Sequence, residues 1–338
     1  MSPPAPRPRI AIVTPVFNEE AVLPELFARL GALFDARREC DWSAVLVDDG
    51  SRDRSAALVR AHAARDPRFV LVELSRNFGF QSALSAGLAC AEAAAVDAVV
   101  TMDADLQDPP EVIPDLVAAW RDGAEIVRAV RRSRAETGPR RLAFDLFHAA
   151  YGKLIDHPIE PNTGTFGLLG RTAVQAYNAL PERHRFFPGL RAWIGFPTAD
   201  VLYDRKNRAA GQPQQTARRL VRYALDGVFS FSRLPLRVLT YAGIFVACLG
   251  FIAGLFFALW RLLGNETSQQ GFTTLAVLVT FLGGVQLIGI GVLGEYLGRI
   301  YDEVKRRPNY IVKPPARPAP SARSAPGTPP APPSAPAA

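Results

Sequence analysis

The stretch AVVTMDADLQDPP, residues 98–110, indicates how the chain folds. An apolar run, Ala98–Met102, is followed at once by a polar cluster that contains Asp103, Asp105 and Gln107. This order is typical of a buried strand in a parallel α/β sheet, where ligands bind beyond the carboxyl ends of the strands. The stretch therefore predicts a strand and, at its end, a polar site.

Three earlier apolar runs also end in polar clusters. They are Ile10–Phe17, Ala44–Val47 and Phe69–Leu74, and a helical pattern of apolar residues separates each strand from the next. This alternation predicts right-handed βαβ units and a mostly parallel sheet, so the fold class is α/β. A helix opened by Pro109 and Pro110 and running to about Asp122, and a further strand, Glu125–Val130, are expected next. Beyond that strand the pattern weakens.

Asp103 and Asp105 are spaced by one residue where the fourth strand ends, so both carboxylates can converge there. Hard oxygen ligands suit Mg²⁺ or Mn²⁺, with diphosphate oxygens completing the shell. Gln107 adds a neutral oxygen ligand within reach. The alternative is a helix cap ahead of Pro109, a role for which Asp108 is also suited.

The second strand ends in Asp48-Asp49-Gly50-Ser51. A carboxylate at this place can accept a hydrogen bond from a base N–H or a ribose hydroxyl. A turn followed by a helix cap is the alternative. The glycine-rich loops match neither a P-loop nor the G-x-G-x-x-G pattern, which disfavours ATP hydrolysis and dinucleotide binding.

The composition narrows the classes of partner. The net charge is +7, and arginine clusters in the middle and towards the C-terminus. Such clusters suit nucleic acid, anionic lipid or a phosphorylated substrate. The 3 cysteines are far apart and are expected to be reduced thiols, and the 4 histidines show no zinc pattern. The apolar stretch near the N-terminus is too short for a secretory signal.

Two long segments, Val238–Trp260 and Phe272–Gly294, contain no charged side chain. As helices each would be about 34 Å long, enough to cross a bilayer core of about 30 Å. Two buried helices of a soluble core are the alternative. The pairs Gly250/Gly254 and Gly294/Gly298 have the spacing that permits close helix contact, although glycine is also simply common in membrane helices. Glu295 and Arg299 are placed to pair at the membrane edge.

Basic residues set the expected orientation of this hairpin. Before the first segment come Arg218, Arg219, Arg222, Arg233 and Arg237, and after the second come Arg299, Lys305, Arg306 and Arg307. Between the two segments only Arg261 occurs. The positive-inside rule therefore predicts that both termini and the α/β domain lie in the cytoplasm.

Four clusters, taken in order, resemble glycosyltransferase family 2. They read PVFNE at residues 15–19, DDGS at 48–51, NFG at 77–79 and DADLQDPP at 103–110. The resemblance implies a nucleotide-diphospho-sugar transferase fold, of the GT-A, Rossmann-like kind. Segments 186–196, 205–211 and 229–237 are similar to those of polyprenyl-phosphate glycosyltransferases, the group that includes dolichol-phosphate mannose synthases and bactoprenol glucosyltransferases.

The patterns along the chain, together with the resemblance, predict a division of the chain. Its parts are a flexible N-terminus (1–9), a catalytic domain (10–215), juxtamembrane interfacial helices (216–237), transmembrane helices (238–262 and 272–297), a cytoplasmic juxtamembrane segment (298–313) and a disordered Pro/Ala-rich tail (314–338). An interfacial helix over Leu220–Pro235 follows from its apolar face, with a plain connecting helix as the alternative. The tail composition cannot build a core.

The resemblance also implies site residues. The nucleotide sugar would be bound by Pro15, Phe17, Glu19, Asp48, Asp49, Asn77, Asp103 and Ala104. The metal, Mg²⁺ or Mn²⁺, would be held by Asp103, Asp105 and Gln107. The acceptor phosphate would be met by Arg131, Arg141, Arg205 and Arg208. The catalytic residues would be Asp103, Asp105 and Arg131.

The implied reaction is inverting, metal-dependent transfer of one sugar, with UDP-glucose favoured, to a polyprenyl (undecaprenyl) phosphate. It would take place at the cytoplasmic face of the bacterial inner membrane, in a homo-oligomer such as a tetramer, with no nucleic acid partner. A processive polysaccharide synthase is one alternative, although its Gln-x-x-Arg-Trp motif and additional spans are absent from the sequence. A non-catalytic, membrane-anchored nucleotide-sugar-binding protein is the other.

The sequence departs from the family pattern in two places. Where the family often has Gly-Asp-Phe-Arg-Leu, this chain has Gly164-Thr165-Phe166-Gly167-Leu168, which lacks both charges. Where the family usually has Ser-Lys-Tyr, this chain has QPQ at residues 212–214. These differences bear on the sugar and on the acceptor loop more than on the class of reaction.

Overall fold

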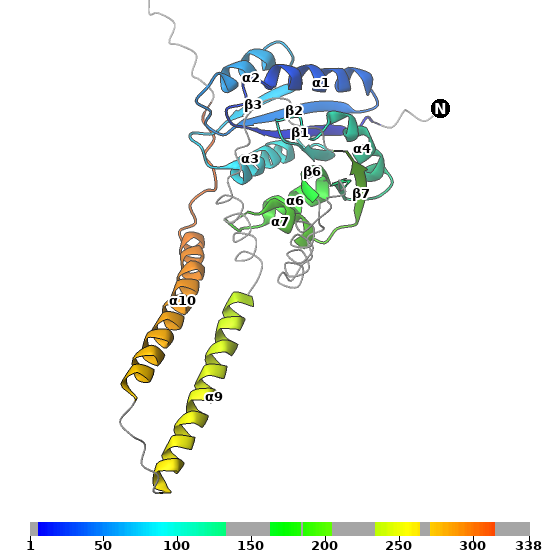
Figure 1. Cartoon of the computed structure of the whole chain (residues 1–338). Helices are drawn as coiled ribbons and strands as arrows, with labels where there is room; N and C mark the ends of the chain where they lie inside the picture. The colour runs from blue at the N-terminus through cyan, green and yellow to red at the C-terminus, as the bar shows by residue number, and fades with distance from the viewer. Residues whose placement is uncertain (1–5, 133–162, 184, 205–233, 264–270, 315–338) are drawn as a thin grey trace, which may run out of the picture.

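The computed structural model describes residues 6–132, 163–183, 185–204, 234–263 and 271–314. An α/β domain carries two long helices, α9 (Leu234–Leu262) and α10 (Phe272–Val304), which extend from one side of it (Figure 1). Several predictions fall outside the described residues: Arg141, Arg205, Arg208, the interfacial helix up to residue 233 and the tail from residue 315.

The domain is built on a 7-stranded sheet of order β3-β2-β1-β4-β6-β5-β7. Its strands are β1 (Arg9–Val16), β2 (Asp41–Asp48), β3 (Phe69–Glu73), β4 (Ala98–Thr101), β5 (Ile126–Arg131), β6 (Thr163–Gly170) and β7 (Thr198–Tyr203). Strand β6 is antiparallel to both β4 and β5, whereas every other neighbouring pair is parallel. The predicted mostly parallel sheet is confirmed. The order of all seven strands could not be predicted, because it requires the positions of β6 and β7, which the sequence pattern did not identify as strands.

Helices cover both faces of the sheet. One face carries α1 (Leu23–Ala36), α2 (Ser55–Ala63) and α4 (Ile113–Arg121), the last of which follows the short helix η1 (Pro110–Val112). The other face carries α3 (Phe80–Ala93), α6 (Arg171–Ala179) and α7 (Phe187–Trp193). Strand residues alternate between the two cores: Ile10 and Ile12 face the first, and Ala11 and Val13 face the second. Each large side chain buried in this way contributes about 1.5–3 kcal/mol of transfer free energy.

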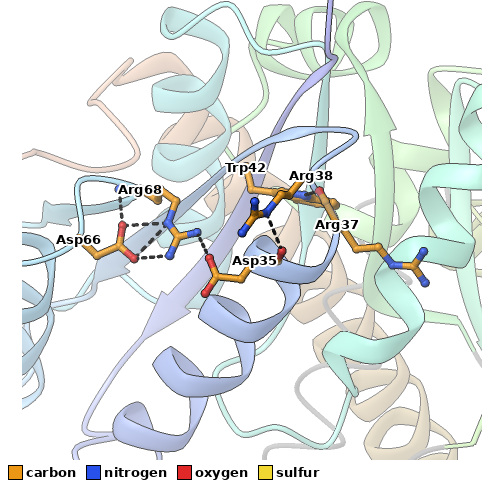
Figure 2. A network of polar contacts seen from close by, with 6 residues as sticks. All are labelled: Asp35, Arg37, Arg38, Trp42, Asp66 and Arg68. Carbon is orange, nitrogen blue, oxygen red and sulfur yellow. Dashed lines mark hydrogen bonds and ion pairs between the residues drawn. The ribbon is translucent and has the colours of Figure 1, made fainter.

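An ion-pair network joins the end of α1 to the start of β3, as Figure 2 shows. The Arg68 guanidinium donates to Asp66 at 2.7 Å and to Asp35 at 2.8 Å. Trp42 donates its indole N–H to the carbonyl of Arg37 at 2.6 Å. Because β2 and β3 begin here, the network lies at the amino ends of the parallel strands, away from the predicted site.

Asp66→Asn should lower the stability of the domain at neutral pH without affecting ligand binding. Hydrogen bonds from Arg68 hold the pKa of Asp66 below its usual range. The resulting stabilisation, about 0.5–1 kcal/mol for a partly exposed pair, is full above pH about 4 and is lost as the pH falls through the lowered pKa. Thermal unfolding at several pH values should therefore separate the variant from the wild type at pH 7 and bring the two together in acid. A difference that persists or grows in acid would contradict this account.

The segment after α10 packs back onto the α/β domain. Leu74 and Val312 form an antiparallel bridge, and Ser75 donates its N–H to the carbonyl of Ile311 at 2.8 Å. Tyr310 packs against the core shared by α3, α6 and α7. Residues 298–313 were predicted only as a cytoplasmic juxtamembrane segment. The structure shows that part of this segment extends the β3 edge of the sheet and so fixes the end of α10 to the domain.

Tyr310→Ala should weaken this attachment. The ring is half-buried, and its loss should cost about 1–3 kcal/mol. Thermal unfolding of the full chain in detergent should show a lower Tm. Ile311→Ala is the matched control, because Ile311 is 53% exposed and uses only its backbone carbonyl in the contact. An equal loss in both variants would mean that the Tyr310 ring adds nothing specific.

Of the described helices, one stretch, Phe281–Val304 in α10, is long and apolar enough to cross a membrane. The apolar part of α9 is shorter, Val238–Ile252. Both predicted membrane spans, 238–262 and 272–297, therefore remain predictions. The helices approach at Gly289, where an added Cβ would lie 3.3 Å from Leu239. At Gly250, Gly294 and Gly298 an added Cβ would meet no atom of the described residues within 4 Å. The predicted pair of Glu295 and Arg299 forms at 3.0 Å.

Candidate functional site

The candidate site lies at the edge of the sheet where the parallel strands end. The register pairs Val16 of β1 with Asp48 of β2, and Asp48 with Glu73 of β3, so these strand ends are level. Strands β5 and β7 end at the same edge with Arg131 and Tyr203, a pair in register. The polar clusters that follow these strands therefore meet at one edge of the sheet.

The loops after β1 and β2 are joined by hydrogen bonds. Asn18 donates its N–H to Oγ of Ser51 at 3.0 Å, and Glu19 donates its N–H to Oγ of Ser55 at 2.9 Å. In return, the N–H of Arg52 donates to Oδ1 of Asn18 at 2.8 Å. Asn18 has a φ of +55°, a left-handed conformation that asparagine tolerates. The two loops thus form one preorganised surface, with Phe17 and Glu19 half-buried in it.

The two adjacent aspartates after β2 have different partners. Both carboxylate oxygens of Asp48 lie 3.3 Å from the N–H of Ser51. Asp49 accepts the N–H of Phe78 at 2.7 Å and that of Gly79 at 2.9 Å. Burial raises the pKa of Asp49 more than these two bonds lower it. Asp49 therefore holds the loop after β3, which leaves Asn77 exposed at the edge.

The loop after β4 turns sharply at Leu106, whose φ is +58°. The Leu106 side chain is buried in the core and holds the backbone in this unfavourable conformation. Oδ1 of Asp105 accepts the N–H of Gln107 at 3.1 Å. Asp103 is more exposed and accepts a hydrogen bond from Oγ1 of Thr165 at 3.2 Å. Thr165 lies on β6, so two distant segments of the chain meet at Asp103.

A second polar network links Asp108, Tyr203 and Arg131. The Tyr203 hydroxyl donates to Oδ1 of Asp108 at 2.5 Å and accepts from Nε of Arg131 at 3.2 Å. Burial and then Asp108 raise the pKa of Tyr203, so the phenol stays protonated. Burial lowers the pKa of Arg131, but Tyr203, Asp108 and Asp103 outweigh it and the net direction is upward.

The predicted capping role of Asp108 is wrong. The residue at the cap position of η1 is Pro109, not Asp108, and Pro109 makes no side-chain hydrogen bond to the helix. The Asp108 carboxylate is buried and holds Tyr203 instead. Sequence analysis did not single out Tyr203, although the alternation of Thr198–Tyr203 is a weak strand signal that could have placed it.

Comparisons with known proteins agree with this geometry. Residues 11–177 match the family described as Glycosyl transferase family 2, and residues 234–300 match the GtrB C-terminal hairpin. The SfII prophage-derived bactoprenol glucosyl transferase of Shigella flexneri is 43% identical over 307 residues, which cover 90% of this chain and 97% of that protein. The chain belongs to glycosyltransferase family 2.

Further relatives of this glycosyltransferase come from other bacteria. An uncharacterized glycosyltransferase of Synechocystis is 43% identical, with 90% of this chain and 94% of that protein covered. The prophage bactoprenol glucosyl transferase homolog of Escherichia coli K12 is 41% identical, with 90% and 98% covered. The recognition of the family from four short motifs is confirmed, and the α/β sheet is the GT-A-like domain that the resemblance implied.

In this glycosyltransferase the described edge brings most of the predicted site residues together. Loops after β1 to β3 carry Phe17, Glu19, Asp48 and Asn77, and the loop after β4 carries Asp103, Ala104, Asp105 and Gln107. Pro15 is buried within β1, just before the first loop, and does not lie in the loop itself. Arg131 lies at the end of β5, at the same edge of the sheet.

The loop after β4 has a donor set that fits a divalent metal. Among the described residues there is no group of 3 or more His, Cys, Asp and Glu side chains that could hold an ion. Mg²⁺ rarely uses such an all-protein cage; one or two carboxylates with substrate phosphates suffice. Asp103 and Asp105, with the amide oxygen of Gln107, supply hard ligands of this kind.

Asp49→Asn tests whether Asp49 acts through the loop that it holds. The new amide would direct an NH₂ group at a backbone N–H, so one of the two hydrogen bonds would be lost at a cost of about 1–3 kcal/mol. We expect a lower Tm together with a raised KM for the nucleotide sugar. Asp41→Asn, at the exposed start of the same strand, is the matched control and should change neither. A raised KM with an unchanged Tm would instead assign Asp49 a direct contact with the nucleotide.

Proposed function

We propose that this glycosyltransferase moves one sugar from a nucleotide-diphosphate sugar, with UDP-glucose favoured, to a polyprenyl phosphate such as undecaprenyl phosphate. One observation carries the proposal: Asp103, Asp105 and Arg131 lie at the same edge of a sheet whose first loops suit a nucleotide. The near full-length similarity to proteins named bactoprenol glucosyl transferases supports the choice of acceptor.

The donor would lie across the loops after β1 to β4. Phe17, Glu19, Asp48 and Asn77 would contact the nucleoside, with Pro15 and Asp49 supporting their loops. Asp103, Asp105 and Gln107 would hold Mg²⁺ or Mn²⁺ against the diphosphate, beside the backbone of Ala104. When bound, the metal would neutralise the charge that develops on the leaving diphosphate.

The acceptor phosphate would need no strong catalytic base. A phosphate monoester has a second pKa near 6, so it is mostly dianionic at pH 7 and is already a nucleophile. Its oxygen would form a bond to the anomeric carbon while the bond to the nucleoside diphosphate breaks on the opposite face, which inverts the configuration. Thr165, a neutral residue, is compatible with this mechanism. Arg131, held by Tyr203, would position the phosphate together with Arg141, Arg205 and Arg208.

The long helices would place this site at the membrane. Large apolar side chains on α9 and α10 are exposed, for example Phe245 at 69% and Leu287 at 70%. Exposed apolar surface of this extent is unfavourable in water but not in lipid. We propose a hairpin of two spans in the bacterial inner membrane, with the catalytic domain and both termini in the cytoplasm, in a homo-oligomer such as a tetramer.

Asp105→Asn should abolish transfer while leaving the protein folded. Loss of one carboxylate removes charge from the metal site, and a fall in kcat of at least about 100-fold is expected. The measurement is transfer of labelled sugar to undecaprenyl phosphate by the purified full chain, tested with a panel of nucleotide sugars and with a chelator. Asp115→Asn, in the first turn of α4, is the control and should keep wild-type activity.

The outcomes separate the alternatives. Near-normal transfer in the presence of a chelator would contradict the metal role. Nucleotide binding without any product would favour a non-catalytic sugar-nucleotide-binding protein. Products that carry several sugars would favour a processive synthase.

A further inference from the structure

Arg191 on α7 is an arginine that the reaction outlined above does not use. It is 3% exposed, and its Nη2 donates to the carbonyl of Gly164 on β6 at 3.2 Å. Its Nη1 is buried and has no hydrogen-bond partner among the described residues. A buried guanidinium nitrogen without an acceptor is uncommon in proteins, because its desolvation is not offset.

The guanidinium of Arg191 lies in space left by a glycine. A Cβ added at Gly167 would lie 3.1 Å from Nη1 of Arg191 and 2.5 Å from the carbonyl oxygen of Val127. In the Gly-Asp-Phe-Arg-Leu stretch that the family often has, position 167 would be the arginine. In this chain the strand has no side chain at that position, and an arginine from α7 reaches it instead.

Among the described residues, the charge on Arg191 is not balanced by a carboxylate of its own. Asp200 is the acid that acts on it, but Asp200 is paired with Arg128 by two bonds, of 2.7 and 2.9 Å. Burial, with a smaller effect of Arg128, lowers the pKa of Arg191 to about 10, so the side chain is still protonated at pH 7. The ligand-free protein therefore holds a buried positive charge next to an ion pair that is already complete.

This charge lies close to the predicted transfer site. The residue after Gly164 is Thr165, whose hydroxyl donates to Asp103. On the other side of the strand, a Cβ at Gly164 would lie 2.8 Å from Nη2 of Arg131. The start of β6 thus runs between two guanidinium groups, Arg131 and Arg191. Helix α7 also lies on the side of the domain from which α9 and α10 extend (Figure 1).

We propose that Arg191 binds a phosphate oxygen in the transfer site, and that it supplies from α7 the positive charge that the strand lacks at Gly167. The inference rests on the function proposed above. The phosphate group is that of the donor diphosphate or that of the polyprenyl acceptor, and in either case the ligand provides the missing counter-charge. A purely structural role, in which Arg191 only supports β6, makes the opposite prediction for stability.

Arg191→Met is the decisive variant, because methionine fills the same space without a charge. If Arg191 serves to bind an anion, the substitution removes an unfavourable buried charge from the ligand-free protein. The Tm of the ligand-free protein then stays the same or rises. Transfer should nevertheless fall by about 10- to 100-fold, the loss of one charged hydrogen bond. Arg191→Lys should recover part of the activity, because it keeps the charge.

Arg185→Met is the matched control. Arg185 lies in the same segment, but it is satisfied by carbonyl oxygens, Tyr177 at 3.1 Å and Glu182 at 3.3 Å, and it stacks on the Tyr177 ring. Its loss should lower the Tm and leave the rate of transfer unchanged at temperatures well below the Tm. If Arg191→Met behaves in the same way, the proposal is wrong and Arg191 is a structural residue.

Ligand-induced shifts in Tm identify the phosphate without any turnover. UDP with Mn²⁺ and a short-chain polyprenyl phosphate are added separately to the wild type and to Arg191→Met. Loss of the shift with UDP assigns Arg191 to the donor diphosphate, and loss of the shift with the lipid assigns it to the acceptor. Both shifts unchanged would overturn the inference. Absence of transfer by the wild type would instead contradict the proposed function, while the shifts still decide the role of Arg191.

Discussion

The antiparallel pairing of β6 with β4 is the constraint on which the site depends. Thr101, the last residue of β4, pairs with Gly167, and its hydroxyl donates to the carbonyl of Thr165. This register places Thr165 beside Asp103, where its hydroxyl reaches the carboxylate. The same strand separates the half of the sheet that would bind the donor from β5 and β7, which carry Arg131 and Tyr203. In the proposed function, the donor and acceptor sides would therefore meet across β6.

Buried charge is distributed unequally around this strand. Carboxylates in the site are engaged by protein donors: Asp49 by two backbone N–H groups and Asp108 by Tyr203. Arg191, in contrast, keeps an N–H group without an acceptor in the described part of the chain. An enzyme that brings two anionic substrates together needs positive charge that its own acids do not neutralise. In the role proposed for it, Arg191 would meet this need at some cost in the stability of the ligand-free protein.

Attachment to the long helices α9 and α10 is part of the same architecture. The segment after α10 adds Val312 to the edge of β3, and Glu303 near the end of α10 accepts the N–H of Arg183. The domain is thus held at its β3 edge and beside the segment that leads into α7. A site that uses a lipid acceptor requires a fixed height and orientation relative to the bilayer, and two separate contacts restrict both better than a single linker would.

Local patterns were enough to predict the first half of the sheet, because each of β1 to β4 is a continuous apolar run that ends in a polar cluster. The family followed from four of these clusters, since their spacing is set by strand ends that meet at one edge. Strand β6 was not predicted, because its glycines weaken the strand signal in the sequence. Its extended conformation comes from pairing with β4 and β5. The partners of Asp108 and the burial of Arg191 belong to tertiary structure alone. Both depend on contacts between segments far apart in the chain, such as Tyr203 with Asp108 and α7 with Gly167, which no local pattern encodes.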